Sequence, residues 1–162
     1  METKNKIIKT GKIFSIISKV VYCLDCVACL TFIVLAITLS YTGAIKSLTA
    51  GETAILFSTL ALYSFIAIGL LWNLERIFVN IVKEETPFSK SAQHYLKKVG
   101  IFLILLSTIP ALVGTILLHS ITPATELNFS IELGGIIAGI VLLVFCQFVQ
   151  YGKELEDKKK LG

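Results

Sequence analysis

Four apolar segments, each about as long as a membrane-spanning helix, take up most of the sequence. They cover residues 20–41, 53–74, 99–118 and 131–151. A helix needs roughly 20 apolar residues to cross a hydrocarbon core of about 30 Å, and none of the four segments has the strict alternation of a membrane β-strand. Because 55% of the 162 residues are hydrophobic and only 16% are charged, little chain is left for a soluble domain. The sequence therefore predicts one integral membrane domain over residues 1–162, an all-α, four-span transmembrane helix bundle.

The basic residues fall on one side of these spans. Fourteen of the fifteen lysines and arginines lie before the first span, between the second and third, or after the fourth, and the exception is Lys46. Because Lys and Arg in short loops are retained in the cytoplasm, we expect both termini and the segment 75–98 to be cytoplasmic. The net charge of +4 then needs no nucleic acid as a direct partner. We expect the basic segments to lie against the lipid bilayer and its anionic head groups.

The segment 75–98, here called the cytoplasmic elbow, is the most structured of the predicted connections. Its first part repeats apolar residues at helical spacing, so we expect the second helix to continue past the membrane or along its surface. The apolar face has Leu74, Ile77, Phe78, Ile81 and Val82, and the polar face has Glu75, Arg76, Asn80, Lys83, Glu84 and Glu85. Pro87 disfavours helix in the residue before it, and Ser89 suits the N-cap of a third helix. Pro87 and Phe88 are therefore the predicted partner-docking residues, at the tip of a helical hairpin.

Asp25 is the most unusual residue of the predicted spans. On insertion scales a carboxylate costs about 2.5 to 3.5 kcal/mol at the centre of a helix, whereas each Leu, Ile, Val or Phe contributes about 0.3 to 0.6 kcal/mol. Asp25 should therefore face the bundle interior and find a polar partner, or hold a proton. Matching depth across the spans nominates Asn73 and Gln147 as intramembrane partners, and Arg76 or Lys98 could reach in from the interface. The carboxylate is either a structural or interfacial acid, neutralised locally, or a functional proton or cation site.

The four cysteines, Cys23, Cys26, Cys29 and Cys146, predict neither a metal site nor a cofactor. Ligand runs of this spacing fold as a loop around the metal, whereas the first three cysteines lie inside a helical span. Four-helix thiol oxidoreductases use Cys-x-x-Cys pairs near the outer surface, and these cysteines lie toward the cytoplasm. Packing is the simpler interpretation. The sequence also has no phosphate loop, no Ser/His/Asp set and no metal-ligand helix motif, so no enzyme activity is expected.

Small residues in the fourth span predict close helix packing. Gly135 and Gly139 form a small-xxx-small pattern that lets another helix approach, and the pattern leaves open whether that helix belongs to the same chain or to a second copy in a homo-oligomer. In the third span, Pro110 lacks a backbone donor and is expected to kink the helix, with Ser107 and Thr108 available to bond the freed groups.

Short motifs around the elbow and after the fourth span carry a family resemblance. They are Glu84-Glu85-Thr86-Pro87-Phe88-Ser89, Leu96-Lys97-Lys98-Val99-Gly100 and Tyr151-Gly152-Lys153-Glu154-Leu155-Glu156. The chain resembles a family of small bacterial four-helix membrane proteins of unknown function, which typically have a Pro-Phe loop before the third helix and a Gly-x-x-Leu tail after the fourth. The resemblance implies a bacterial cytoplasmic membrane as the location. It also implies a partner, the small helix-turn-helix transcription regulator often encoded beside family members. Residues 157–162 depart from the acidic-Leu-Thr-hydrophobic ending of the family, so the resemblance does not extend to a contact made by that ending.

Two functions follow as hypotheses. The first is a non-enzymatic membrane accessory protein, regulatory or self-protective, that presents the elbow and the basic tail to a partner. The alternative is a small proton-coupled exporter that uses Asp25, because minimal four-helix exporters place an acid in their first span and act as dimers. A thiol oxidoreductase is a more remote third. A water-accessible cavity at Asp25 would favour the exporter, and a solid bundle with a conspicuous elbow would favour the accessory role.

Overall fold

In the computed structural model, the chain forms four long α-helices. They are α1 (Glu2–Thr42), α2 (Ala50–Glu84), α3 (Lys90–Ile121) and α4 (Leu133–Leu161). The structure describes residues 2–42, 49–84, 90–121 and 131–161, and no strand occurs among them. All four helices are long and apolar enough to cross a membrane. The predicted all-α fold with four spans is confirmed.

Each helix extends beyond its apolar segment. α1 has 41 residues and α2 has 35, against the roughly 20 that cross a hydrocarbon core. α2 continues without a break through the first part of the elbow to Glu84, as the apolar periodicity predicts. α3 begins at Lys90, and the predicted docking residues Pro87 and Phe88 and the predicted cap Ser89 lie outside the described residues.

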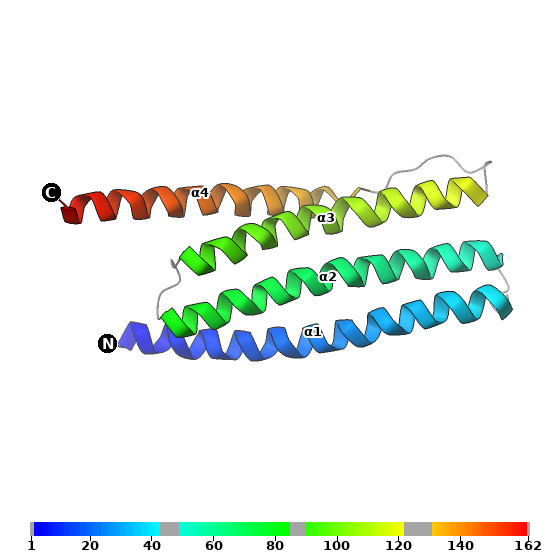
Figure 1. Ribbon diagram of the computed structural model, residues 1–162, viewed down its shortest axis with the longest axis horizontal. Helices are drawn as coiled ribbons and strands as arrows, with labels where there is room; N and C mark the ends of the chain where they lie inside the picture. Colours follow the sequence, from blue (N-terminus) through cyan, green and yellow to red (C-terminus); the bar gives the residue numbers. More distant parts are fainter. Residues whose placement is uncertain (1, 43–48, 85–89, 122–130, 162) are drawn as a thin grey trace.

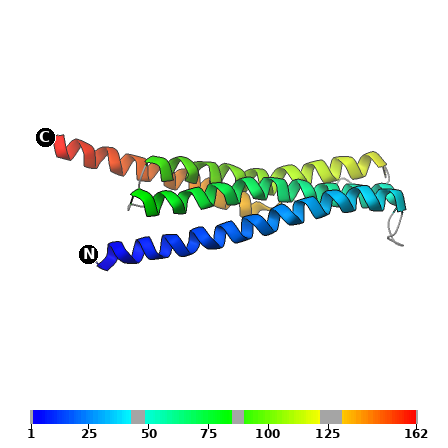
Figure 2. The ribbon, with the colours of Figure 1, turned by 60° about the horizontal axis from the view of Figure 1, so that its bottom comes forward.

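The helices follow one another in space in the order of the chain. Among the described residues, Cα atoms within 8 Å of each other join α1 with α2, α2 with α3 and α3 with α4, and no other pair. Figure 1 shows an antiparallel row of helices with α1 and α4 outermost, and Figure 2 shows the same row turned about its long axis. The bundle is therefore more open than a compact four-helix bundle, in which the helices surround one shared core.

Both chain ends lie at the same end of the molecule. α1 and α3 begin there, and α2 and α4 end there (Figure 1). We call it the basic end, because the described residues at it include Lys12, Lys19, Arg76, Lys90 and Lys97. This placement is what an even number of spans requires. Which side of the membrane the basic end faces stays a prediction from the lysines and arginines.

A capping box fixes the start of α2 at the opposite end. The Thr49 N–H donates to Oε2 of Glu52 at 2.8 Å, and the Glu52 N–H donates to the Thr49 hydroxyl at 3.3 Å. Such reciprocal bonds satisfy backbone donors that the first turn of a helix leaves unpaired. The Thr-x-x-Glu spacing of this motif explains why α2 begins at Ala50, before the apolar segment 53–74.

Glycines bring the backbones of α3 and α4 together. A Cβ atom on Gly139 would lie 2.6 Å from the carbonyl oxygen of Gly100, and one on Gly135 would collide with the Ser107 hydroxyl. No side chain fits at these two points, so the small-residue pattern of α4 packs against α3 of the same chain. The sequence pattern left open whether these two glycines contact a helix of the same chain or of a second copy, and the structure shows a helix of the same chain.

Pro110 is fully buried in α3. A proline removes the bond to the carbonyl four residues earlier, which here is that of Leu106. The Ser107 hydroxyl donates to Leu103 at 2.9 Å and the Thr108 hydroxyl donates to Ile104 at 2.8 Å. The prediction that these two hydroxyls serve the freed group is therefore wrong, because each bonds the carbonyl four residues before itself.

α4 is offset toward the basic end relative to α3. Gly135 lies against Ser107, yet α4 begins at Leu133 while α3 continues for several turns past Ser107, to Ile121. The offset places the end of the apolar segment of α4 beside the polar first turns of α3. A cleft lined by both helices lies at that junction.

Candidate functional site

Asp25 lies where α1 packs on α2. Aromatic contacts mark the register of this antiparallel pair: Phe14 stacks on Phe78 near the basic end, with ring centroids 5.2 Å apart, and Phe32 lies 6.5 Å from Phe57 farther along. Asp25 falls between these two contacts. Its side chain therefore faces another helix and not the lipid alone.

Ser64 of α2 is the polar residue that lies beside the Asp25 carboxylate. Ser64 itself is only 7% exposed. The second carboxylate oxygen, Oδ2, is buried and has no partner among the described residues. One turn along α1, the Cys29 thiol donates to the carbonyl of Ala61 at 3.6 Å. The α1–α2 contact thus holds a carboxylate beside a buried serine, and one buried oxygen of that carboxylate has no hydrogen-bond partner among the described residues.

The predicted partners of Asp25 are wrong. Asn73 is buried on α2, but its amide donates to the carbonyl of Gly69 at 2.6 Å, within the same helix. Gln147 is exposed on α4, and α4 contacts α3 and not α1. Matching depth identifies residues at similar levels, but depth does not say which helices are neighbours or which faces meet.

A charged and aromatic cluster joins α1 and α2 closer to the basic end. Oε1 of Glu75 lies 3.5 Å from Nζ of Lys19, and Oε2 lies 4.0 Å from Nε of Arg76. The Arg76 guanidinium lies over the Trp72 ring, 4.6 Å from its centroid, and Tyr22 lies 5.7 Å from the same ring. Glu75 is buried, so its predicted place on the outward polar face is wrong. Glu75 is covered because α1 also continues past its span and places Lys19 against it, whereas Lys83 and Glu84 of the same predicted polar face are exposed.

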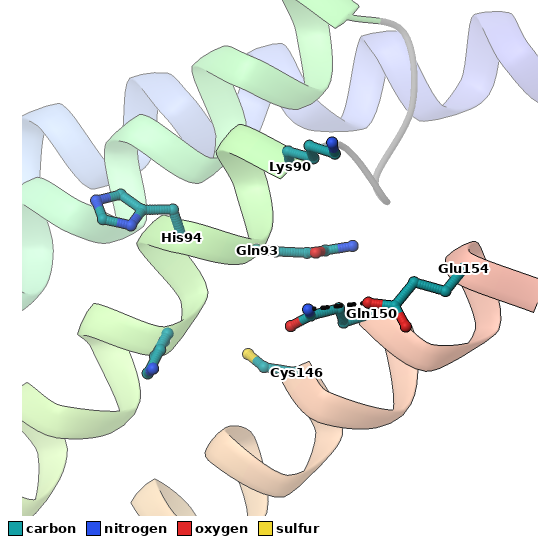
Figure 3. A pocket seen from close by; sticks show the side chains of 7 residues that line it. Lys90, Gln93, His94, Cys146, Gln150 and Glu154 are labelled. Carbon is teal, nitrogen blue, oxygen red and sulfur yellow. Dashed lines mark hydrogen bonds between the residues drawn. The ribbon is translucent and has the colours of Figure 1, made fainter. Parts of the chain in front are cut away.

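The third polar site is a cleft between α3 and α4 at the basic end, here called the α3–α4 cleft. It has a volume of about 380 Å³ and is lined by Lys90, Gln93, His94, Lys97, Cys146, Gln150 and Glu154. In Figure 3, Lys90 and Gln93 extend from α3 toward α4, and the sulfur of Cys146 points back toward α3. The amide of Gln150 donates to Oε1 of Glu154 at 3.2 Å. Sequence analysis did not find this cleft, because the offset of α4 that creates it has no signature in the sequence.

The described residues offer little for metal or redox chemistry. No three His, Cys, Asp or Glu side chains gather as metal ligands in the part of the chain that the structure describes. All four cysteines are free thiols. Cys146 is on α4 and the other three are on α1, and these two helices do not contact each other. A relay of electrons between two cysteine pairs has no structural support.

Comparison with models of protein families, with curated proteins and with solved structures found no match for this chain. The family resemblance of the elbow and the tail, and the regulator that it implies as a partner, stay predictions.

Proposed function

We propose that the chain is a non-enzymatic multi-pass membrane protein that binds a partner through its basic end, in a regulatory or self-protective role. The main support is that the helices of the first hairpin continue beyond their apolar segments at this end and pack on each other there. The elbow would then be presented on a preformed helical base, at the same end of the molecule as the tail of α4.

The extensions of α1 and α2 beyond their apolar segments contact each other through several side chains. Phe14 stacks on Phe78, and a Cβ atom on Gly11 would lie 2.9 Å from Cγ2 of Val82. Lys19 and Glu75 add an ion pair at the start of the extension. Because a preorganised surface loses less conformational entropy on binding than loose chain does, packed extensions favour a docking role. A small helix-turn-helix regulator, implied by the family resemblance, is the proposed partner, and the chain itself needs no contact with nucleic acid.

Affinity purification from native membranes tests the docking role. The partner should co-purify with the wild-type chain and be lost with Phe88→Ala, since aromatic anchors carry much of the binding energy of interfaces. Phe148→Ala is the matched control, because Phe148 is 70% exposed on α4. Equal recovery of the partner with both variants would remove the elbow from the proposal.

Cysteine labelling tests the proposed cytoplasmic orientation of the basic end. In a cysteine-free background, single cysteines at Lys46 and Glu126 should react with an impermeant thiol reagent in intact cells, and one at Ser91 should not. Labelling at Ser91 alone would reverse the orientation.

A small proton-coupled exporter is the second candidate, because Asp25 has a buried oxygen without a partner. Proton exchange at a carboxylate inside a membrane protein is a common basis for transport. The test uses proteoliposomes with an imposed pH gradient and ethidium as the transported cation. Asp25→Asn should abolish proton-driven ethidium movement if Asp25 carries the proton, while Ser64→Ala, which keeps the carboxylate, should retain it. Absence of ethidium movement with the wild-type chain would count against this candidate.

A further inference from the structure

We propose that the α3–α4 cleft binds a phosphate-bearing anion at the membrane surface. This inference goes beyond the docking role proposed above, and it concerns other residues and a different kind of ligand.

The charge of the lining favours an anion. Lys90 and Lys97 are seven residues apart, about two turns, so they lie on one face of α3. Both line the cleft, and both are exposed. Among the described residues that line the cleft, the only acid is Glu154, whose carboxylate accepts a hydrogen bond from Gln150 (Figure 3). In this described lining, two ammonium groups therefore share a small volume with one carboxylate that is already bonded.

The remaining lining suits phosphate oxygens. Gln93 and Gln150 bring amide groups from the two facing helices. An amide nitrogen carries two N–H groups, so the Gln150 amide, which donates one to Glu154, can donate the other to a phosphate oxygen that a lysine neutralises. A volume of about 380 Å³ is at the small end for ligand pockets in general. It is large enough for one phosphate with its first substituent and too small for a folded peptide.

The position of the cleft points to lipid as a source of the phosphate. Lys97 comes just before the apolar segment 99–118, and Cys146 belongs to the apolar segment 131–151. The cleft therefore lies at the border between apolar span and polar extension, which is the depth of lipid phosphates. Basic pockets between membrane helices at this depth bind anionic head groups. Below it, α3 and α4 expose apolar side chains such as Ile101 and Phe145, beside which acyl chains can lie.

Binding measurements on the purified full-length chain in detergent test the proposal. The lipid probes are short-chain phosphatidylglycerol and phosphatidylcholine of the same chain length, followed by native mass spectrometry. The soluble probe is inorganic phosphate, followed by equilibrium dialysis. The cleft variant is Lys90→Gln with Lys97→Gln. The matched control is Lys9→Gln with Lys83→Gln, which removes two exposed charges from the basic end outside the cleft.

The cleft variant should weaken phosphatidylglycerol binding about tenfold for each lysine removed, as expected for charge-assisted bonds, while the control variant binds like the wild type. Glu154→Gln should bind more tightly than the wild type. If inorganic phosphate binds with the same dependence on the two lysines and phosphatidylglycerol binds no better than phosphatidylcholine, the anion site stands and its phosphate comes from a soluble molecule. Equal losses in the cleft and control variants, or no binding of any probe, would overturn the proposal. Neither result affects the Phe88→Ala experiment, so the two proposals fail separately.

Discussion

The first and last helix pairs of the molecule are joined in opposite ways. α1 meets α2 through side chains, including an aromatic stack, an ion pair and the bond from the Cys29 thiol to the Ala61 carbonyl. α3 meets α4 through glycines, where the backbone of Gly139 approaches that of Gly100. Side chains can repack when one partner of a contact is replaced, but two backbones in contact leave no room for a larger residue. We therefore expect the stability of the α3–α4 pair to depend on the size of a substituted side chain, and that of the α1–α2 pair to depend on its polarity and charge.

Replacing Gly139 should have the largest effect. Gly139→Val puts a branched side chain where even a Cβ would lie 2.6 Å from the Gly100 carbonyl oxygen, and overpacking of this kind costs about 3 kcal/mol. Unfolding of the purified chain in detergent, followed by circular dichroism, gives the free energy. Gly134→Val is the control, because a Cβ on Gly134 meets nothing within 4 Å. Equal losses at both positions would show that valine harms α4 itself and not its contact with α3.

Asp25→Leu should stabilise the chain, by about 1 kcal/mol. A carboxylate with an unpaired buried oxygen is costly in a low-dielectric contact, and an apolar replacement of similar volume is often neutral or stabilising. Loss of the polar interaction with Ser64 offsets part of the gain. The same unfolding assay measures the change in the free energy of unfolding, with Asp25→Asn as the variant that keeps a polar side chain of similar size. A clear loss of stability with leucine would mean that Oδ2 has a partner in the membrane, such as water or a cation.

Removal of the cap on α2 should cost about 1 kcal/mol. Thr49→Ala deletes the hydroxyl that pairs with Glu52, and the free energy of unfolding should fall. Ser58→Ala, at an exposed position within α2, is the control and should change stability little. Glu52→Ala should lower the free energy of unfolding less in the Thr49→Ala variant than in the wild type, because the two residues form one motif.

Lys19→Gln should have the smallest effect, about 0.5 kcal/mol. Lys19 lies 3.5 Å from Glu75, but its side chain is 65% exposed, so water and salt screen the pair. In high salt, Lys19→Gln should have the same free energy of unfolding as the wild type, whereas Gly139→Val should remain less stable than the wild type. A salt-independent loss would indicate that the aliphatic part of Lys19 carries the contact.

The fold was largely predictable from the sequence, because the length of each apolar segment alone sets the number of spans. Gly135 and Gly139 were predictable for a similar reason, since close approach of helices requires small residues at fixed spacing. The position of Ser64 beside Asp25 was not predictable, because a serine in a span can have many roles and no sequence pattern distinguishes them. Pairing the first two spans as an antiparallel hairpin would have placed Ser64 within about one and a half turns of Asp25. The burial of Glu75 and the α3–α4 cleft depend on how far the helices extend and on their offsets, which hydropathy does not determine.

In the part of the chain that the structure describes, only consecutive helices contact each other, and this has a consequence for biosynthesis. Each helix after the first can pack on the one inserted just before it, so only α1 has to wait in the bilayer for a partner that the ribosome has yet to make. A chain that stops after α3 would keep both the α1–α2 and α2–α3 contacts. The molecule can thus be assembled in the order of its synthesis, one helix at a time.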